Sequence, residues 1–257
     1  MALSKKQEKW LEKINFYYDK EKLEKVPAEL STEEFWLEAV RKNNWAMEFV
    51  PEAFKTEAFY LTAVQQDGRA LQYIPDAQKT KPLCLTAVQQ IGNALEYVPD
   101  ALKTKTLCLT AMQNQQWGVL LQYVPEALKT EAICLAAVQK SGDALQYVPE
   151  ALKTEAICLE AMKHSNVHIT ILYRGGMGMQ TPPPPTHPLQ QVPEKLRTEA
   201  VCLAAVLNDY RAQDFIPEAL KTEAFEEKIR SIRSLMSSGS GGSGYGIELI
   251  KPISKKA

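Results

Sequence analysis

Residues 120–143 read LLQYVPEALKTEAICLAAVQKSGD, and variants of this 24-residue phrase recur along most of the chain. A Val-Pro or Ile-Pro pair marks each copy, with proline at positions 27, 51, 75, 99, 125, 149, 193 and 217. Successive prolines are 24 residues apart, except for one interval of 26 residues and one of 44. Such a fixed period is the signature of a stacked repeat protein, because one short unit cannot bury its own apolar face.

Each copy predicts two short helices. Thr130 precedes a helix expected over 131–139, because its hydroxyl can accept a backbone N–H of the first turn. Apolar residues at helical spacing give that helix a broad buried face. Gly142 is typical of the left-handed residue that follows a helix. A second short helix is expected over 144–148, where Pro149 ends it and begins another turn as a first helical residue.

The chain has five cysteines, and all of them fall at the same position of the repeat: Cys84, Cys108, Cys134, Cys158 and Cys202. A free cysteine usually behaves as a small buried apolar side chain. The odd count and the absence of a CxxC pair argue against a disulfide framework. We therefore expect five buried thiols in the repeat core.

Composition limits the classes of function and compartment. The 257 residues carry a formal net charge of -1, which gives no reason to expect a nucleic-acid partner. No apolar stretch reaches the roughly 18 residues that a membrane span needs, and the charged N-terminus does not predict a secretory signal. These features favour a cytoplasmic protein with no membrane partner.

The repeated phrase resembles the tandem units of a bacterial repeat family labelled DUF4116, whose copies follow the pattern AL-YVPE-L-T---CL-AV. The resemblance covers eight copies, at about residues 21–225. It implies a helical repeat fold and carries no known activity. We predict an all-α fold, an α-solenoid of about eight 24-residue two-helix repeats over 21–236, with residues 1–20 as a capping helix.

An insertion at 168–187 interrupts the repeat. Residues 167–173 alternate in polarity and are rich in β-branched side chains, so they predict a strand within a small β-like insertion. Insertions in repeat proteins often lie on the binding face. The alternative is a tolerated surface loop. We take as candidate partner-binding residues those of the strand and of the turn after it: His168, Thr170, Leu172, Tyr173 and Arg174.

Two other departures from the repeat are candidate binding residues. Lys81 and Lys105 stand where five other copies have glutamate, and with Lys79 and Lys103 they predict one exposed basic patch for an acidic partner. Solvated surface lysine is the alternative. Trp117 lies in a two-residue expansion of its copy, where it is either an exposed anchor or a core residue that fills the longer loop.

The C-terminal end has a different composition. Residues 237–244 are serine and glycine, as in the flexible linkers of engineered fusions, and 245–257 match no repeat position. We interpret 245–257 as a tethered peptide or terminal strand that acts as an intramolecular ligand by β-addition to the insertion. The alternative identity of this segment is a tag or cloning remnant. The alternative binding site for it is the ladder of tyrosine and glutamine side chains along the repeats. The expected anchors of this segment are Tyr245, Ile247, Leu249 and Ile250.

These patterns favour a peptide- or protein-binding scaffold that is not an enzyme and needs no cofactor. The three histidines, His164, His168 and His187, flank or lie in the insertion, which contains no Asp or Glu. We therefore expect solvated histidines and no metal site. The alternative function is a structural or regulatory adaptor that docks a larger assembly through the insertion.

Overall fold

The computed structural model describes residues 3–14, 20–114, 120–165 and 187–238. These residues form α-helices and 3-10 helices and contain no strand, which confirms the all-α repeat fold. The predictions for Trp117, for the insertion residues 168–186 and for the segment 239–257 lie outside the described residues. Within the described part of the chain, no helix combines the length and the apolar character that a bilayer crossing requires.

The chain divides into two compact units, residues 1–128 and residues 129–257. The α-helices of the first unit are α1 (Lys5–Glu12), α2 (Lys20–Glu24), α3 (Glu33–Lys42), α4 (Glu57–Gln66), α5 (Lys81–Gln90) and α6 (Lys105–Gln113). Its 3-10 helices are η1 (Asn44–Phe49), η2 (Glu52–Phe54), η3 (Gly68–Tyr73), η4 (Asp76–Gln78), η5 (Gly92–Tyr97), η6 (Asp100–Leu102), η7 (Leu120–Tyr123) and η8 (Glu126–Leu128).

The second unit repeats the same order of elements. Its α-helices are α7 (Glu131–Lys140), α8 (Glu155–Lys163), α10 (Glu199–Asn208) and α11 (Glu223–Ser238). Its 3-10 helices are η9 (Gly142–Tyr147), η10 (Glu150–Leu152), η12 (Pro188–Gln191), η13 (Glu194–Leu196), η14 (Tyr210–Phe215) and η15 (Glu218–Leu220). Helix α11 ends two residues inside the predicted serine and glycine linker.

Each full copy consists of an α-helix, a 3-10 helix of up to six residues and a three-residue 3-10 turn, so its second helix is of the 3-10 type. The capping prediction is confirmed: the Thr130 hydroxyl accepts the Ile133 N–H at 3.4 Å. Val148 is extended at φ -76° and ψ 124°, as expected before proline. Pro149 itself precedes η10 at its N-cap, and the expectation that it is the first helical residue is wrong.

Gly142 corrects a second expectation. Ser141 follows α7 with φ -153°, and Gly142 begins η9 without adopting the left-handed conformation. Its N–H donates to the His164 carbonyl at 2.8 Å, and a Cβ atom there would lie 2.2 Å from the Ala161 carbonyl oxygen. The absence of a side chain is therefore needed for the close approach of the next copy, and not for a helix cap.

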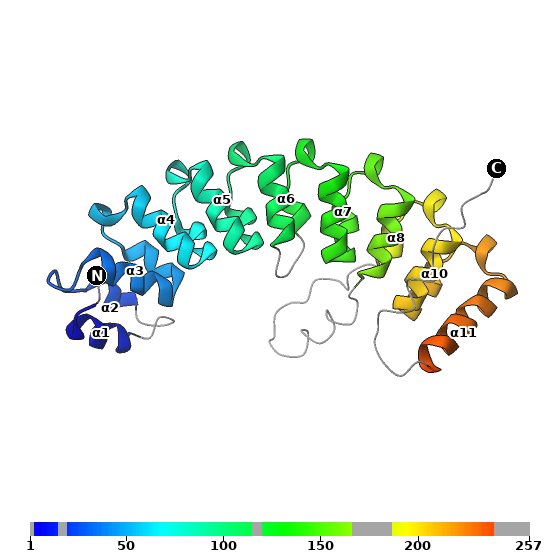
Figure 1. Cartoon of the computed structure of the whole chain (residues 1–257), viewed down its shortest axis with the longest axis horizontal. Helices are drawn as coiled ribbons and strands as arrows, with labels where there is room; N and C mark the ends of the chain where they lie inside the picture. The colour runs from blue at the N-terminus through cyan, green and yellow to red at the C-terminus, as the bar shows by residue number, and fades with distance from the viewer. Residues whose placement is uncertain (1–2, 15–19, 115–119, 166–186, 239–257) are drawn as a thin grey trace. The chain divides into compact units, whose positions relative to one another are not determined.

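The core of each unit lies between two layers of helices. In the first unit one layer consists of α3, α4, α5 and α6, packed in sequence order, and the second layer consists of η1, η3, η5 and η7 (Figure 1). In the second unit one layer consists of α7, α8, α10 and α11, and the other consists of η9, η12 and η14. Helix α7 shows the buried pattern, with Ile133, Cys134, Ala137 and Val138 at most 2% exposed. Apolar side chains therefore fill the space between successive copies.

Helix α1 lies within residues 1–20, for which the sequence predicted a capping helix, and α2 lies at the start of the predicted solenoid. Ser4 and Gln7 form a capping box at the start of α1, and Gln7 is buried. The Gln7 side-chain amide donates to the Leu30 carbonyl at 3.0 Å and to the Thr32 hydroxyl at 2.9 Å. Helix α1 is thus fixed to the first repeat by hydrogen bonds as well as by its buried Leu11.

Candidate functional site

The structure overturns the prediction of one exposed basic patch. Lys79 and Lys103 have side chains that are only 6% exposed. The Lys79 ammonium donates to the Tyr97 carbonyl at 2.8 Å, and the Lys103 ammonium donates to the Tyr123 carbonyl at 2.7 Å. Each ammonium also contacts the aspartate three residues before it, at 2.8 Å. These lysines join one copy to the next and are not free to bind a partner.

This lysine contact, which we call the lysine tether, recurs in the second unit. Lys129 donates to the Tyr147 carbonyl at 2.9 Å, and Lys153 donates to the Gln191 carbonyl at 3.0 Å. In the following copy Arg197 replaces lysine and donates to the Phe215 carbonyl at 3.3 Å. Sequence reasoning missed the tether, although a basic residue follows seven of the eight marker prolines by four positions.

Lys81 and Lys105 are exposed, in contrast to Lys79 and Lys103. No hydrogen bond or ion pair of either side chain is found among the described residues. The glutamates at the same repeat position do make contacts in the second unit, where Glu155 accepts from the Thr198 hydroxyl at 2.7 Å and Glu199 pairs with Lys228. Lys81 and Lys105 therefore remain available to a partner.

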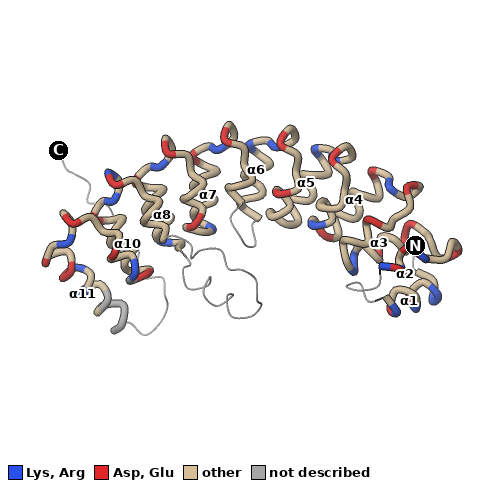
Figure 2. Tube along the Cα trace, turned by 180° about the vertical axis from the view of Figure 1, so that it is seen from behind, with Lys and Arg blue, Asp and Glu red and all other residues tan. Residues whose placement is uncertain are grey.

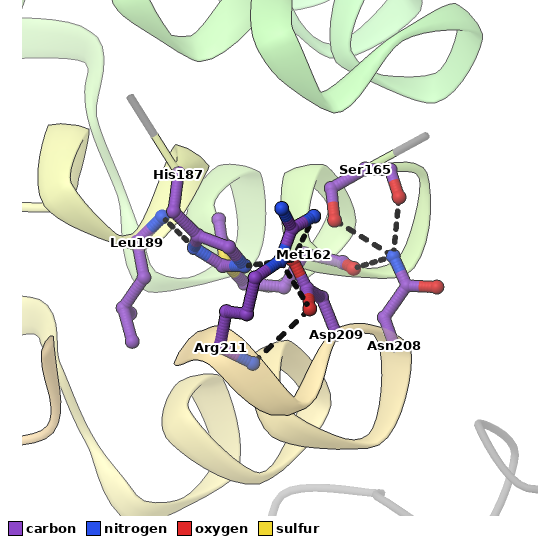
Figure 3. Close-up of polar contacts among 7 residues, drawn as sticks. All are labelled: Met162, Ser165, His187, Leu189, Asn208, Asp209 and Arg211. Carbon is purple, nitrogen blue, oxygen red and sulfur yellow. Dashed lines mark hydrogen bonds and ion pairs between the residues drawn. The ribbon is translucent and has the colours of Figure 1, made fainter. Parts of the chain in front are cut away.

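Besides Lys81 and Lys105, a second candidate site is the α8–α10 junction. There, Ser165 and His187 border the segment 166–186. Helices α8 and α10 pack directly against each other in spite of these intervening residues. The Asn208 side-chain amide donates to the Met162 carbonyl at 3.1 Å and to the Ser165 carbonyl at 2.6 Å, and also lies 2.7 Å from the Ser165 hydroxyl (Figure 3). Asn208 thus fixes the N-terminal border of the segment.

His187 fixes the C-terminal border. Its side chain is 5% exposed, and its Nδ1 accepts the Leu189 N–H at 3.0 Å, which caps η12. The ring stacks on Phe215 with centroids 5.9 Å apart. Its Nε2 faces Asp209 at 3.8 Å, too far for a hydrogen bond, and is buried without a partner (Figure 3). His187 is therefore a buried structural residue, and the expectation that it is solvated is wrong.

Electrostatics keep this histidine neutral and its neighbour charged. Burial lowers the pKa of His187, and the negative charge of Asp209 offsets part of that effect. Burial by itself would raise the pKa of Asp209, but hydrogen bonds from the Arg211 side chain and backbone, at 3.0–3.1 Å, leave that pKa below its ordinary value. The junction thus holds a neutral imidazole beside a carboxylate that is already paired with a guanidinium.

The described residues of the junction do not form a set of metal ligands. No group of three or more His, Cys, Asp or Glu side chains in the described residues could hold a metal ion. His164, at the end of α8, lies 3.2 Å from Glu160 and is 42% exposed. The prediction for His168 lies outside the described residues, as do those for Thr170, Leu172, Tyr173 and Arg174. The anchors predicted at Tyr245, Ile247, Leu249 and Ile250 also lie outside them.

The five cysteines are buried free thiols, as predicted. Each side chain is inaccessible to solvent, at 0% relative exposure. Burial raises the pKa of Cys158 and that of Cys202 to about 11, and it also raises the pKa of Cys84 and Cys108. Thiols of this kind are poor nucleophiles, because the thiolate is the reactive form.

Comparison with known proteins agrees with this geometry. The model of a family described as Domain of unknown function (DUF4116) matches residues 32–79, 56–103 and 104–153. Over residues 32–153, which are less than half of the chain, the sequence is therefore similar to the repeats of this family. No curated protein and no solved structure matches the chain. The first two matches overlap and begin 24 residues apart, which is the repeat period of the sequence.

Proposed function

We propose that this chain is a non-catalytic repeat scaffold that binds a protein or peptide through the segment 166–186. The observation that carries the proposal is the α8–α10 junction. The stack is complete without the segment, since α8 packs on α10, Lys153 reaches the Gln191 carbonyl and Thr198 contacts Glu155. A separate set of polar residues nevertheless fixes the two residues that border the segment.

The free-energy cost of the buried polar residues at the junction supports a binding role for that segment. Burying polar groups stabilises a fold little even when they are hydrogen-bonded, because water already satisfies them in the unfolded chain. His187 also leaves one buried nitrogen without a partner, which is a net cost. We infer that these residues serve to position the borders of the segment, and that His168, Thr170, Leu172, Tyr173 and Arg174 make the partner contacts. Tyrosine and arginine are common energetic centres of protein interfaces.

The proposed ligand class is a short extended peptide, with the chain's own residues 245–257 as the first to test. That segment follows the insertion in the chain, and its sequence has alternating apolar residues at Tyr245, Ile247 and Leu249. A tether raises the effective concentration of a weak ligand to about the millimolar range. Even a weak complex would therefore form within one chain.

The test uses a chain that ends at Ser238 and a fluorescently labelled peptide of residues 245–257. We expect saturable binding in fluorescence anisotropy, and loss of that binding when residues 167–174 are replaced by an equal length of glycine and serine. A scrambled peptide is the control for composition. Equal binding to both chains would exclude the segment as the site, and absence of binding to the intact segment would exclude this peptide as the ligand.

A further inference from the structure

Three adjacent helices of the first unit share an uncharged outer surface. Helices α4, α5 and α6 each carry one charged residue, at the first position of the helix, and no other Lys, Arg, Asp or Glu along their length (Figure 2). The same outward positions hold a leucine followed by a threonine in each helix. We call this surface the leucine–threonine face; it consists of Leu61, Thr62, Leu85, Thr86, Leu109 and Thr110, all half-buried or exposed.

Covering this face with a partner costs little. Leu85 is 37% exposed and is the one large apolar side chain classed as exposed among the described residues. The Thr62 hydroxyl donates to the Ala58 carbonyl at 2.9 Å, and the Thr86 hydroxyl donates to the Pro82 carbonyl at 3.0 Å. These donors are satisfied within their own helices, so a partner that excludes water leaves neither of them unpaired. Removal of the leucine surface from water is favourable.

The charge-free surface is not a general property of the repeat. In α3 the equivalent position to Thr62 is Glu38, which pairs with Arg41 at 2.7 Å. In α8 the equivalent position is Glu160, which pairs with Lys163 at 3.2 Å. Ion pairs of this kind must be desolvated before a partner can cover them. The leucine–threonine face lacks that barrier.

The spacing of the leucines favours a helical partner over an extended one. Helices that pack side by side lie about 8–10 Å apart, which sets the interval between successive leucines of the face. Seven residues of an α-helix, close to two turns, advance about 10.5 Å, so a helix laid across α4, α5 and α6 presents one side chain per leucine at every seventh residue. An extended strand covers that interval in about three residues, which would turn successive side chains to opposite sides.

The exposed lysines of α5 and α6 favour a partner that carries negative charge. Lys81 and Lys105 are exposed at the first positions of α5 and α6, where the helix dipole adds to their positive charge. Each lies four residues before the face leucine of its own helix, Leu85 or Leu109, and therefore on the same side of that helix. We propose that the leucine–threonine face binds an amphipathic helix of another protein, with apolar residues seven apart and carboxylates along the flank that meets Lys81 and Lys105.

The probe is a pair of labelled synthetic helical peptides of about 16 residues, a length that spans roughly 24 Å as a helix. Both carry leucine at every seventh residue, and their flanking residues are glutamate in one and lysine in the other. We expect the acidic peptide to bind the full chain saturably and about ten-fold or more tightly than the basic peptide, a difference of about 1.4 kcal/mol. Added salt should reduce this preference.

Variants locate the site. Leu85→Glu should weaken binding of the acidic peptide about ten-fold. Gln89→Glu, at an exposed position of the same helix, should also weaken binding of this peptide. Joint replacement Lys81→Glu and Lys105→Glu should reverse the preference between the two peptides. Leu159→Glu, on the ion-paired face of α8, is the matched control and should change nothing. Circular dichroism and thermal unfolding establish that each variant is folded.

Three results would overturn the proposal. The first is the absence of saturable binding of the acidic peptide, and the second is equal affinity for the acidic and basic peptides. The third is unchanged affinity in a folded Leu85→Glu variant. Because the leucine–threonine face and the segment 166–186 belong to different units, these outcomes leave the test with the peptide of residues 245–257 unaffected.

Discussion

At the scale of single residues, Gly142 shows how closely two copies approach each other. A Cβ atom at this position would lie 2.2 Å from the Ala161 carbonyl oxygen and 2.9 Å from the backbone of Ser165. Because both neighbours are backbone atoms of the next copy, they cannot move aside without shifting α8. The same contact is present in the first unit, where a Cβ on Gly68 would lie 2.4 Å from the Ala87 carbonyl oxygen.

Gly142→Ala should therefore destabilise the chain by about 3 kcal/mol, at the upper end of the usual cost of overpacking. Urea unfolding followed by circular dichroism measures the change. Ser141→Ala is the control, because the Ser141 side chain makes no capping hydrogen bond and the change should stay within roughly 0.5 kcal/mol. Equal stability of the two variants would show that the copies are not in contact at Gly142.

His187 makes stability depend on pH. Its Nδ1 accepts the Leu189 N–H, so the neutral ring carries its proton on Nε2, which faces Asp209. Protonation places a hydrogen on Nδ1 and removes the capping bond. Because burial lowers the pKa of His187 from 6.5, the unfolded chain takes up this proton first as the pH falls. The contribution of His187 to stability is thus present above pH 6.5 and is lost as the pH falls below it.

His187→Asn removes this titration and keeps an effective helix cap, since asparagine is among the preferred N-cap residues. The wild-type chain should lose more unfolding free energy than the variant between about pH 7.5 and about pH 5.5. Urea unfolding at both pH values measures the two losses, and groups that titrate in both proteins cancel in the comparison. Losses of equal size would mean that His187 does not bind a proton differently in the two states.

At the scale of elements, the lysine tether links the 3-10 helices η5, η7, η9 and η12 to the copy that precedes each of them. The Tyr97 and Tyr123 carbonyls that accept the tether are at the C-terminal ends of η5 and η7. Unsatisfied carbonyls collect at that end of a helix, and a cation there is favourable. The tether therefore satisfies a helix terminus that would otherwise depend on water.

Lys103→Met should cost about 1–3 kcal/mol, because it removes the ammonium that donates to the part-buried Tyr123 carbonyl. Lys103→Arg should retain most of the stability, since Arg197 makes the equivalent contact with the Phe215 carbonyl. Lys105→Met changes an exposed side chain two residues away and is expected to stay within roughly 0.5 kcal/mol. Thermal unfolding of the three variants ranks them, and a Lys105→Met loss as large as that of Lys103→Met would contradict the tether.

At the scale of the whole molecule, the apolar contacts between copies carry the fold, and the five cysteines report on them. All five are at 0% exposure in the two units. We expect a thiol reagent to label the native protein slowly at all five positions and the denatured protein rapidly at all five. Rapid native labelling of Cys108 or Cys134, followed by mass spectrometry, would contradict the packing described for the unit that holds that residue.

Much of the repeat was predictable, because it depends on contacts close in sequence. The Thr130 cap joins residues three apart, and Val148 is extended because Pro149 follows it. The burial of the cysteines followed from their shared repeat position. The 3-10 form of the second helix was not predicted, since the same residues could form a short α-helix and the packing between copies selects the tighter turn.

At the candidate sites, too, the sequence shows which groups can donate hydrogen bonds, but it does not show which partners they meet. Lys79 and Lys81 are only two residues apart in the sequence, yet the Lys79 side chain is 6% exposed and Lys81 is exposed. Lys79 finds its acceptor 18 residues away, and Asn208 finds the Ser165 carbonyl 43 residues away. A sequence supplies the donors, but the partner of each donor depends on which copy the fold brings beside it.

The sequence by itself determined the repeat period, the helix starts and the identity of the core, because propensity, capping and apolar periodicity act within one copy. Only the tertiary structure decided which lysines are buried, why Gly142 has no side chain and how Ser165 and His187 are fixed. These features depend on atoms of two copies at distances of about 3 Å, and such contacts form only after the copies have stacked. The outward leucines of α4, α5 and α6 likewise became one surface only when their helices packed side by side.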